Sequence, residues 1–110
     1  MTEPGLVPAD DSGPPGYARR VLAVVESIPR GKVMTYGDLA EYLEDGGPRQ
    51  VGAVMARYGD GAPWWRVVNA SGMLPPQLRG EAALHYATER TPYDKSRERV
   101  NLRTARWDGG

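Results

Sequence analysis

The apolar positions in the first half of the chain recur three times with the spacing of an α-helix. The first stripe predicts a helix that Pro29 and Gly31 end, and consists of Tyr17, Val21, Val24, Val25 and Ile28. The second stripe consists of Tyr36, Leu39, Ala40 and Leu43. The third follows Pro48, which suits the first position of a helix, and consists of Val51, Val54, Met55 and Tyr58. Two short helices separated by the glycine pair 46–47 predict a helix-turn-helix.

Local signals fix where the second helix begins. Thr35 stands at the N-cap position with Asp38 three residues later, which is a near variant of the capping box. Before it, residues 32–34 are predicted to be a short extended link.

The second half of the chain predicts a small hairpin and one more helix. Residues 66–68 are β-branched and extended, residues 69–72 (Asn-Ala-Ser-Gly) are a turn signal, and residues 73–74 are predicted to return as a second strand, forming a wing. A last helix is predicted over 77–89. The tail from 99 to 107 has apolar anchors at Val100, Leu102 and Trp107.

These elements predict a mainly α protein with a winged helix-turn-helix fold. At 110 residues the chain has room for one core. We expect a disordered N-terminal tail over 1–16, rich in Pro, Gly and Asp, an ordered domain over 17–107, and a C-terminal tail over 108–110.

Composition narrows the chemistry. The chain has no cysteine and one histidine, so thiol nucleophiles, disulfides and thiolate metal sites are excluded. We expect no signal peptide or membrane span, and a soluble, cytoplasmic protein. The 14 basic and 14 acidic residues balance, but residues 1–16 carry three acids and no base, whereas residues 95–110 carry a net charge of +3. The even balance predicts modest, salt-sensitive affinity for nucleic acid.

The most informative segment is Pro63-Trp64-Trp65-Arg66-Val67. It resembles the Pro-Cys-His-Arg-Val signature of the O6-alkylguanine-DNA alkyltransferases, with tryptophan at both the cysteine and the histidine positions. Three further motifs of this family occur in the same order, at 28–40, 49–55 and 69–72. Tryptophan at the cysteine position is typical of the alkyltransferase-like branch. The resemblance covers residues 17–107 and implies the fold of the family's C-terminal DNA-binding domain.

The resemblance also implies that the chain cannot accept an alkyl group. Family enzymes transfer the group to the cysteine, which their histidine and a glutamate activate. Here those positions hold Trp64 and Trp65, and we expect the glutamate position to fall near Thr91. Nucleophile, base and orienting acid would all be missing. Arg66 is expected to be buried and structural, Trp65 to belong to the core, and His85 to have no partner.

By resemblance, the helix-turn-helix binds the minor groove of DNA and flips the damaged base out of the stack. Arg49 matches the arginine finger that replaces the flipped base, and Tyr36 matches the tyrosine that pushes on the neighbouring phosphate. Thr35 caps its helix and is a candidate phosphate ligand. Gln50 is a candidate for hydrogen bonds to a base edge or sugar, and the small residues at 52 and 53, Gly52 and Ala53, allow close approach.

The resemblance places the lesion in a pocket with Trp64 against the alkyl group. Met55, Val67 and Ser71 are the expected walls. In the loop 74–80, either Gln77 or Arg79 is expected to reach the base edge or the O6 substituent.

We therefore interpret the chain as a non-enzymatic sensor that binds O6-alkylguanine in double-stranded DNA and hands it to nucleotide excision repair proteins. It would act as a monomer, without metal or organic cofactor. Three alternatives remain open: a winged-helix transcriptional regulator that reads a sequence in the major groove, an enzyme such as a glycosylase with Asp60 as its carboxylate, and a protein-interaction module that does not bind DNA.

Overall fold

The computed structural model describes residues 15–110. The predicted tail over 1–16 falls almost wholly outside the described residues. The ordered elements begin with α1 (Gly16–Ser27), β1 (Met34–Thr35), α2 (Tyr36–Leu43) and α3 (Pro48–Tyr58). All three predicted N-terminal helices are confirmed. The capping box is confirmed as well, because Asp38 N donates to Thr35 Oγ1 and Thr35 N donates to the Asp38 carboxylate, each over 3.0 Å.

The second half of the chain contains short elements around one longer helix. Two 3-10 turns, η3 (Gly59–Gly61) and η4 (Trp64–Arg66), lead into β2 (Val67–Val68). A third turn, η5 (Pro76–Leu78), precedes α4 (Arg79–Glu89), which confirms the predicted helix over 77–89. The chain ends with β3 (Tyr93–Asp94), β4 (Arg99–Val100) and α5 (Leu102–Ala105).

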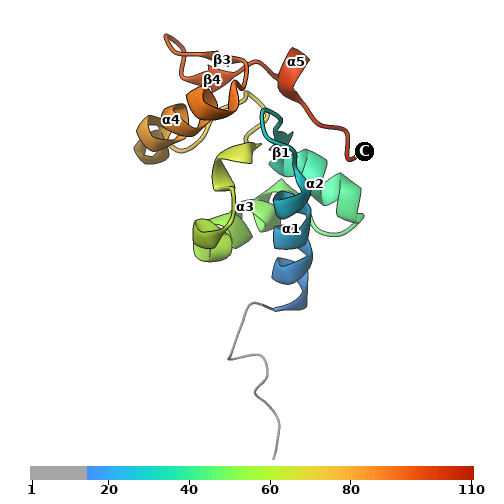
Figure 1. Cartoon of the computed structure of the whole chain (residues 1–110). Helices are drawn as coiled ribbons and strands as arrows, with labels where there is room; N and C mark the ends of the chain where they lie inside the picture. Colours follow the sequence, from blue (N-terminus) through green and yellow to red (C-terminus); the bar gives the residue numbers. More distant parts are fainter. Residues whose placement is uncertain (1–14) are drawn as a thin grey trace, which may run out of the picture.

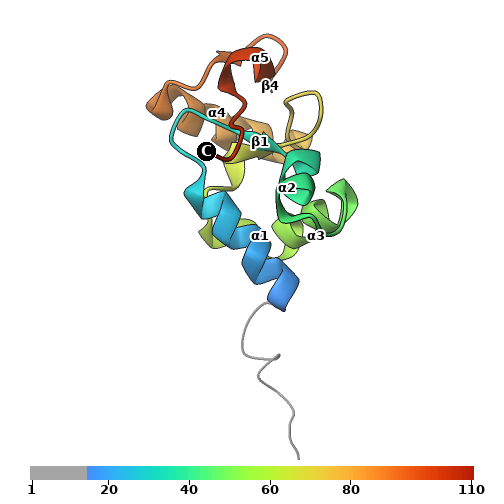
Figure 2. The same cartoon turned by 90° about the vertical axis from the view of Figure 1, so that its right-hand side faces the viewer.

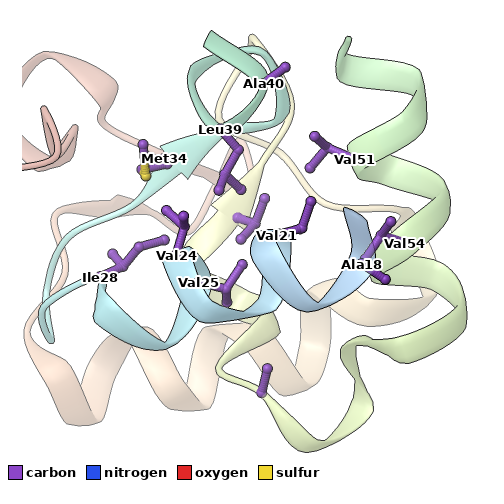
Figure 3. Close-up of a cluster of buried hydrophobic side chains, with 12 residues drawn as sticks. Ala18, Val21, Val24, Val25, Ile28, Met34, Leu39, Ala40, Val51 and Val54 are labelled. Atoms are coloured by element: carbon purple, nitrogen blue, oxygen red, sulfur yellow. The ribbon is translucent and has the colours of Figure 1, made fainter. Parts of the chain in front are cut away.

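The helices α1, α2 and α3 form one end of the molecule, and α4, β3, β4 and α5 form the other (Figures 1 and 2). Figure 3 shows the core of the first end, where side chains of α1 such as Val21 and Val25 point toward Leu39 of α2 and Val51 of α3. These four side chains are fully or almost fully buried.

The strands β1 and β2 run parallel between the two ends and hold them together. Met34 pairs with Val67 in the ladder, and both pack into the α1–α3 core. Val33 and Val68 pack into the second core, beneath α4 and β4. Successive side chains of a strand point to opposite faces, so this short ladder serves both cores at once.

The predicted hairpin wing at 66–74 is wrong in its pairing. β2 pairs with β1, not with residues 73–74, and the returning segment stays irregular. The turn itself forms, since Asn69 Oδ1 accepts from the backbone N–H groups of Ser71 and Met73. The two prolines at 75 and 76 have no N–H to extend a ladder. The antiparallel pair occurs instead between β3 and β4, and of these two strands β4 lies in the segment 99–107 that was predicted as a tail.

Gly72 explains how this turn docks on the second core. Its φ is +81°, and a Cβ there would lie 2.4 Å from the carbonyl oxygen of Val100, so only glycine fits. The Val100 N–H donates to the Gly72 carbonyl over 2.8 Å. The expected anchors of the C-terminal segment pack as predicted, with Val100 and Leu102 in the second core and Trp107 against the first.

Candidate nucleic-acid interface

A cavity of about 320 Å³ opens between α3, the turns η3 and η4, and the segment 74–78. That volume is at the lower end of the range of about 300–1,000 Å³ for small-molecule sites. Four of the five residues predicted to surround a lesion line it, namely Trp64, Met55, Val67 and Gln77. The structure also adds walls that the sequence reasoning missed, chiefly Leu74, Pro75 and Leu78.

The prediction for Ser71 is wrong, because its side chain does not line this cavity. Ser71 is exposed on the 69–72 turn and borders a separate hollow beside Arg99 and Asn101. The turn is drawn onto β4 by the Gly72–Val100 contact, which carries Ser71 away from Trp64.

The structure separates the two candidates on the 74–80 loop. Arg79 Nε donates to the Leu74 carbonyl over 2.7 Å, and its guanidinium also lies 3.4 Å from Glu98. Arg79 therefore stabilises the loop through these contacts and is not part of the cavity lining. Gln77 is exposed and lines the cavity, so it is the residue of the two that is placed to meet a ligand.

At the start of α2, Tyr36 borders the same cavity, and burial raises the pKa of its hydroxyl above the ordinary value of 10.0. The hydroxyl therefore stays a hydrogen-bond donor. Thr35 is 4% exposed and its hydroxyl oxygen caps the helix. The cap is confirmed, whereas a phosphate contact of Thr35 stays a prediction.

The first two turns of α3 present the predicted DNA-contacting residues. Arg49 is exposed and makes no side-chain hydrogen bond or ion pair with residues 15–110. Gln50 Oε1 accepts from the N–H of Gly47 over 3.0 Å, so its oxygen is used in capping the helix while its NH₂ group remains free to donate. Ala53 is exposed, and a Cβ at Gly52 would meet nothing within 4 Å. At positions 52 and 53 this face of α3 therefore carries only small side chains with open space around them. It lies beside the cavity, which Gly52 helps to line.

The two tryptophans of η4 both pack against the second core but differ in their other contacts. Trp64 lines the cavity, and its ring stands edge-on to Trp65 with centroids 5.5 Å apart. Trp65 packs against the second core and stacks on His85 at 3.6 Å with the rings 4° from parallel. The expectation that Trp65 belongs to the core holds, although its side chain is only partly buried. The expectation that His85 has no partner is wrong.

The carboxylate of Glu89 accepts hydrogen bonds from three residues beneath η4, an arrangement called the Glu89 hub below. The sequence did not predict it. Arg66 donates to Glu89 through Nε (3.1 Å) and Nη2 (2.7 Å), the Trp65 indole donates over 2.8 Å, and the Gly31 N–H donates over 3.2 Å. Arg66 Nη1 also binds the Ile28 carbonyl. The two charged side chains are 13% and 4% exposed, so the prediction that Arg66 is buried and structural is confirmed.

Burial by itself would raise the pKa of the Glu89 carboxyl, but the hydrogen bonds from Arg66, Gly31 and Trp65 outweigh it and hold the pKa below its ordinary value. This finding corrects the expectation that no carboxylate stands behind the histidine position. The acid is Glu89, two residues before Thr91, and it accepts a hydrogen bond from Trp65. The sequence offered one clue to this position, because Glu89 is the last residue of the helix predicted over 77–89.

Residues 15–110 contain no group of three or more His, Asp or Glu side chains arranged to hold a metal ion. No helix among them is long and apolar enough to cross a membrane.

Comparison with known proteins agrees with this arrangement of residues. Residues 16–90 match the family described as 6-O-methylguanine DNA methyltransferase, DNA binding domain. The chain belongs to this family. S. pombe Atl1, solved in complex with damaged DNA containing O6-carboxymethylguanine, superposes with a TM-score of 0.70 and 29% identity, over 83% of this chain and 94% of that one. The O6-methylguanine methyltransferase of Mycobacterium tuberculosis gives a TM-score of 0.60 and 26% identity, over 74% of this chain and 54% of that one.

Curated relatives carry the name DNA base-flipping protein. The one from Escherichia coli K12 is 44% identical over 63 residues, or 53% of this chain, and that from Vibrio parahaemolyticus is 38% identical over 58 residues, or 50% of this chain. The matched parts are 47% and 58% of those proteins, so the chain spans about half the length of the curated relatives it matches. Together with Trp64 at the cysteine position, these similarities place the chain in the alkyltransferase-like branch, and they confirm the fold class.

Proposed function

We propose that this protein is a non-enzymatic DNA damage sensor that binds O6-alkylguanine in double-stranded DNA by flipping the base into the cavity beside Trp64. The observation that carries the proposal is the position of that cavity. It lies directly beside the open face of α3, with Tyr36 on its wall and Trp64 where the family enzymes have their cysteine. The relatives support it, because Atl1 was solved with damaged DNA and the curated relatives are named for base flipping.

The free energy gained by stacking a flipped base on an aromatic ring is comparable to the free energy needed to extrude it from the duplex. Extruding a base costs a few kcal/mol, and less when the base is damaged and pairs poorly. Stacking of a base on an aromatic side chain contributes about 1–3 kcal/mol. Stacking in the cavity and insertion of the Arg49 guanidinium would offset part of the extrusion cost for any guanine. The preference for a damaged guanine would come from its lower extrusion cost and from contact of the alkyl group with the apolar walls around Trp64.

Alkyl transfer is not part of the proposal, because the chain has no thiol. The buried Glu89 carboxylate is paired with Arg66 and Trp65, and is therefore committed to structure. The protein would keep the lesion bound and pass it to nucleotide excision repair proteins. We further propose that it acts as a monomer in the cytoplasm, associated with the nucleoid when bound to DNA.

A titration on two short duplexes at one defined salt concentration tests the proposal. The duplexes are identical except that O6-methylguanine replaces one guanine. We expect tighter binding to the lesion, weakened by Arg49→Ala and by Trp64→Ala, with the methyl group still on the DNA by mass spectrometry. Arg57→Ala is the matched control, since Arg57 is an exposed arginine in the last turn of the same helix.

The alternatives predict other outcomes. Equal binding to both duplexes would contradict lesion sensing, and dependence on the surrounding sequence would then favour a transcriptional regulator. Loss of the base from the duplex would reveal a glycosylase that uses Asp60, which does line the cavity. An absence of affinity for either duplex would leave a protein-interaction module.

A further inference from the structure

The cavity beside Trp64 has mainly apolar walls and carries an acid. Its polar side chains are Tyr36 and Gln77, which are neutral, and Asp60. Among the described residues 15–110, Asp60 is the one charged side chain in the lining. None of the ion pairs within that range involves Asp60, so a neighbouring cation does not neutralise the carboxylate.

The backbone fixes where this carboxylate lies. Asp60 is the middle residue of η3, which follows α3 without a break. The N–H of Ala62 donates to the Gly59 carbonyl over 2.9 Å, and the N–H of Trp64 donates to the Ala62 carbonyl over 2.7 Å. Gly59 is buried against Met55, which is another wall of the cavity. The acid is therefore held on a tight turn, four residues before the tryptophan that is proposed to meet the alkyl group.

The negative charge of Asp60 affects which O6 substituents the cavity can bind. We propose that Asp60 makes this site select uncharged O6 substituents, such as methyl or hydroxyethyl, over anionic ones, such as carboxymethyl. A second carboxylate in a cavity with apolar walls is repelled by the first, whereas a neutral substituent is not, and a hydroxyl can donate to Asp60. The inference rests on the proposed function, since it assumes that the adduct enters this cavity.

Atl1 differs from what we propose for this chain in the adduct that it binds. That relative was solved with DNA containing O6-carboxymethylguanine, an adduct that carries a carboxylate. At 29% identity the two proteins share the fold but differ at most positions. Selection against the same adduct by the present chain would therefore be a property of its own residues.

The test measures the affinity of the full chain for four duplexes that differ at one base: guanine, O6-methylguanine, O6-hydroxyethylguanine and O6-carboxymethylguanine. Hydroxyethyl and carboxymethyl are close in size, so their affinity ratio isolates charge. We expect the wild-type protein to bind the hydroxyethyl duplex about fivefold more tightly than the carboxymethyl duplex. Asp60→Asn should lower that ratio about threefold or more, and the wild-type ratio should shrink as salt rises.

Glu26→Gln is the matched control, because it removes one negative charge from an exposed position on α1. It changes the affinity for every duplex alike and should leave the ratio unaltered. Asp60 is itself exposed, so Asp60→Asn should fold normally, which a thermal melt verifies.

The outcomes separate the two proposals. If the wild-type protein does not distinguish O6-methylguanine from guanine, the proposed function fails. If it prefers O6-methylguanine but binds the carboxymethyl and hydroxyethyl duplexes equally, or if Asp60→Asn leaves their ratio unchanged, the selection by Asp60 is overturned while the proposed function stands.

Discussion

The indole Nε1 of Trp65 donates a hydrogen bond to Glu89 Oε2 over 2.8 Å. Trp65 occupies the position at which the alkyltransferase signature has histidine, so the bond joins the histidine position to a buried acid. A tryptophan N–H can donate but cannot accept a proton, and therefore the pair cannot relay one. With Arg66 on the same carboxylate, the pair instead ties η4 to α4 and to the end of α1.

The Glu89 hub should contribute substantially to stability. Glu89→Gln removes the charge opposite Arg66, and breaking a buried ion pair on one side leaves the other charge uncompensated. We expect the free energy of unfolding to fall by about 3–5 kcal/mol in urea denaturation. Glu81→Gln, on the exposed face of α4, should change it by less than about 0.5 kcal/mol. A loss of the same small size for Glu89→Gln would show that the hub is not stabilising.

The same carboxyl gives stability a dependence on pH. Because the pKa of Glu89 is held below its ordinary value of 4.5 in the folded state, its contribution is complete above that value and is lost as the pH falls through the folded pKa. The pKa of Asp38 is lowered in the same direction: burial opposes the shift, and hydrogen bonds from Arg106 and Thr35 outweigh burial.

Melting temperatures measured from about pH 7 to pH 3 should therefore fall below about pH 5. The gap between wild-type protein and Glu89→Gln should be constant at neutral pH and close in acid. A gap that widened as the pH fell would contradict the depressed pKa.

Tyr36→Phe should separate binding from folding. Tyr36 borders the cavity, and its hydroxyl makes no side-chain hydrogen bond with residues 15–110. Removal of the hydroxyl should therefore change the free energy of unfolding by less than about 0.5 kcal/mol. If the hydroxyl binds the phosphate beside the lesion, affinity for the O6-methylguanine duplex should fall severalfold. Unchanged affinity would remove Tyr36 from the interface.

Arg49 should act through its flat guanidinium as well as its charge. Arg49→Ala should lower lesion affinity about tenfold, and Arg49→Lys should recover little of it because an ammonium does not stack between bases. A 2-aminopurine next to the lesion brightens when its neighbour leaves the stack, and both variants should reduce that signal. If Arg49→Lys behaved as wild type, Arg49 would serve as a phosphate contact.

The sequence predicted the helices well because their signals are local. Thr35 and Asp38 close a capping box within four residues, and Pro48 starts α3 at the position where a missing N–H costs nothing. The apolar spacing alone placed Val21, Leu39 and Val51 in the core.

The parts that failed depend on long-range contacts. Nothing near Val67 and Val68 shows that they pair with residues 34–35, more than thirty positions earlier, and this pairing displaced the predicted hairpin. Ser71 was assigned to the cavity from its place in a motif, but the approach of Gly72 to Val100 turns it away. Glu89 was missed because its partners come from the loop after α1 and from η4, far from it in the sequence.

The most direct test of lesion capture places a fluorine probe on the adduct. A duplex with O6-(2,2,2-trifluoroethyl)guanine carries a ¹⁹F reporter where the alkyl group should meet Trp64. On binding, we expect a displaced resonance, moved again by Trp64→Leu and left in place by Trp107→Phe, whose ring packs against the α1–α3 core beside a different hollow. Capture of the alkylated base in this cavity would be contradicted by either of two results. The ¹⁹F resonance of the bound complex could match that of the free duplex, or it could be unaffected by Trp64→Leu.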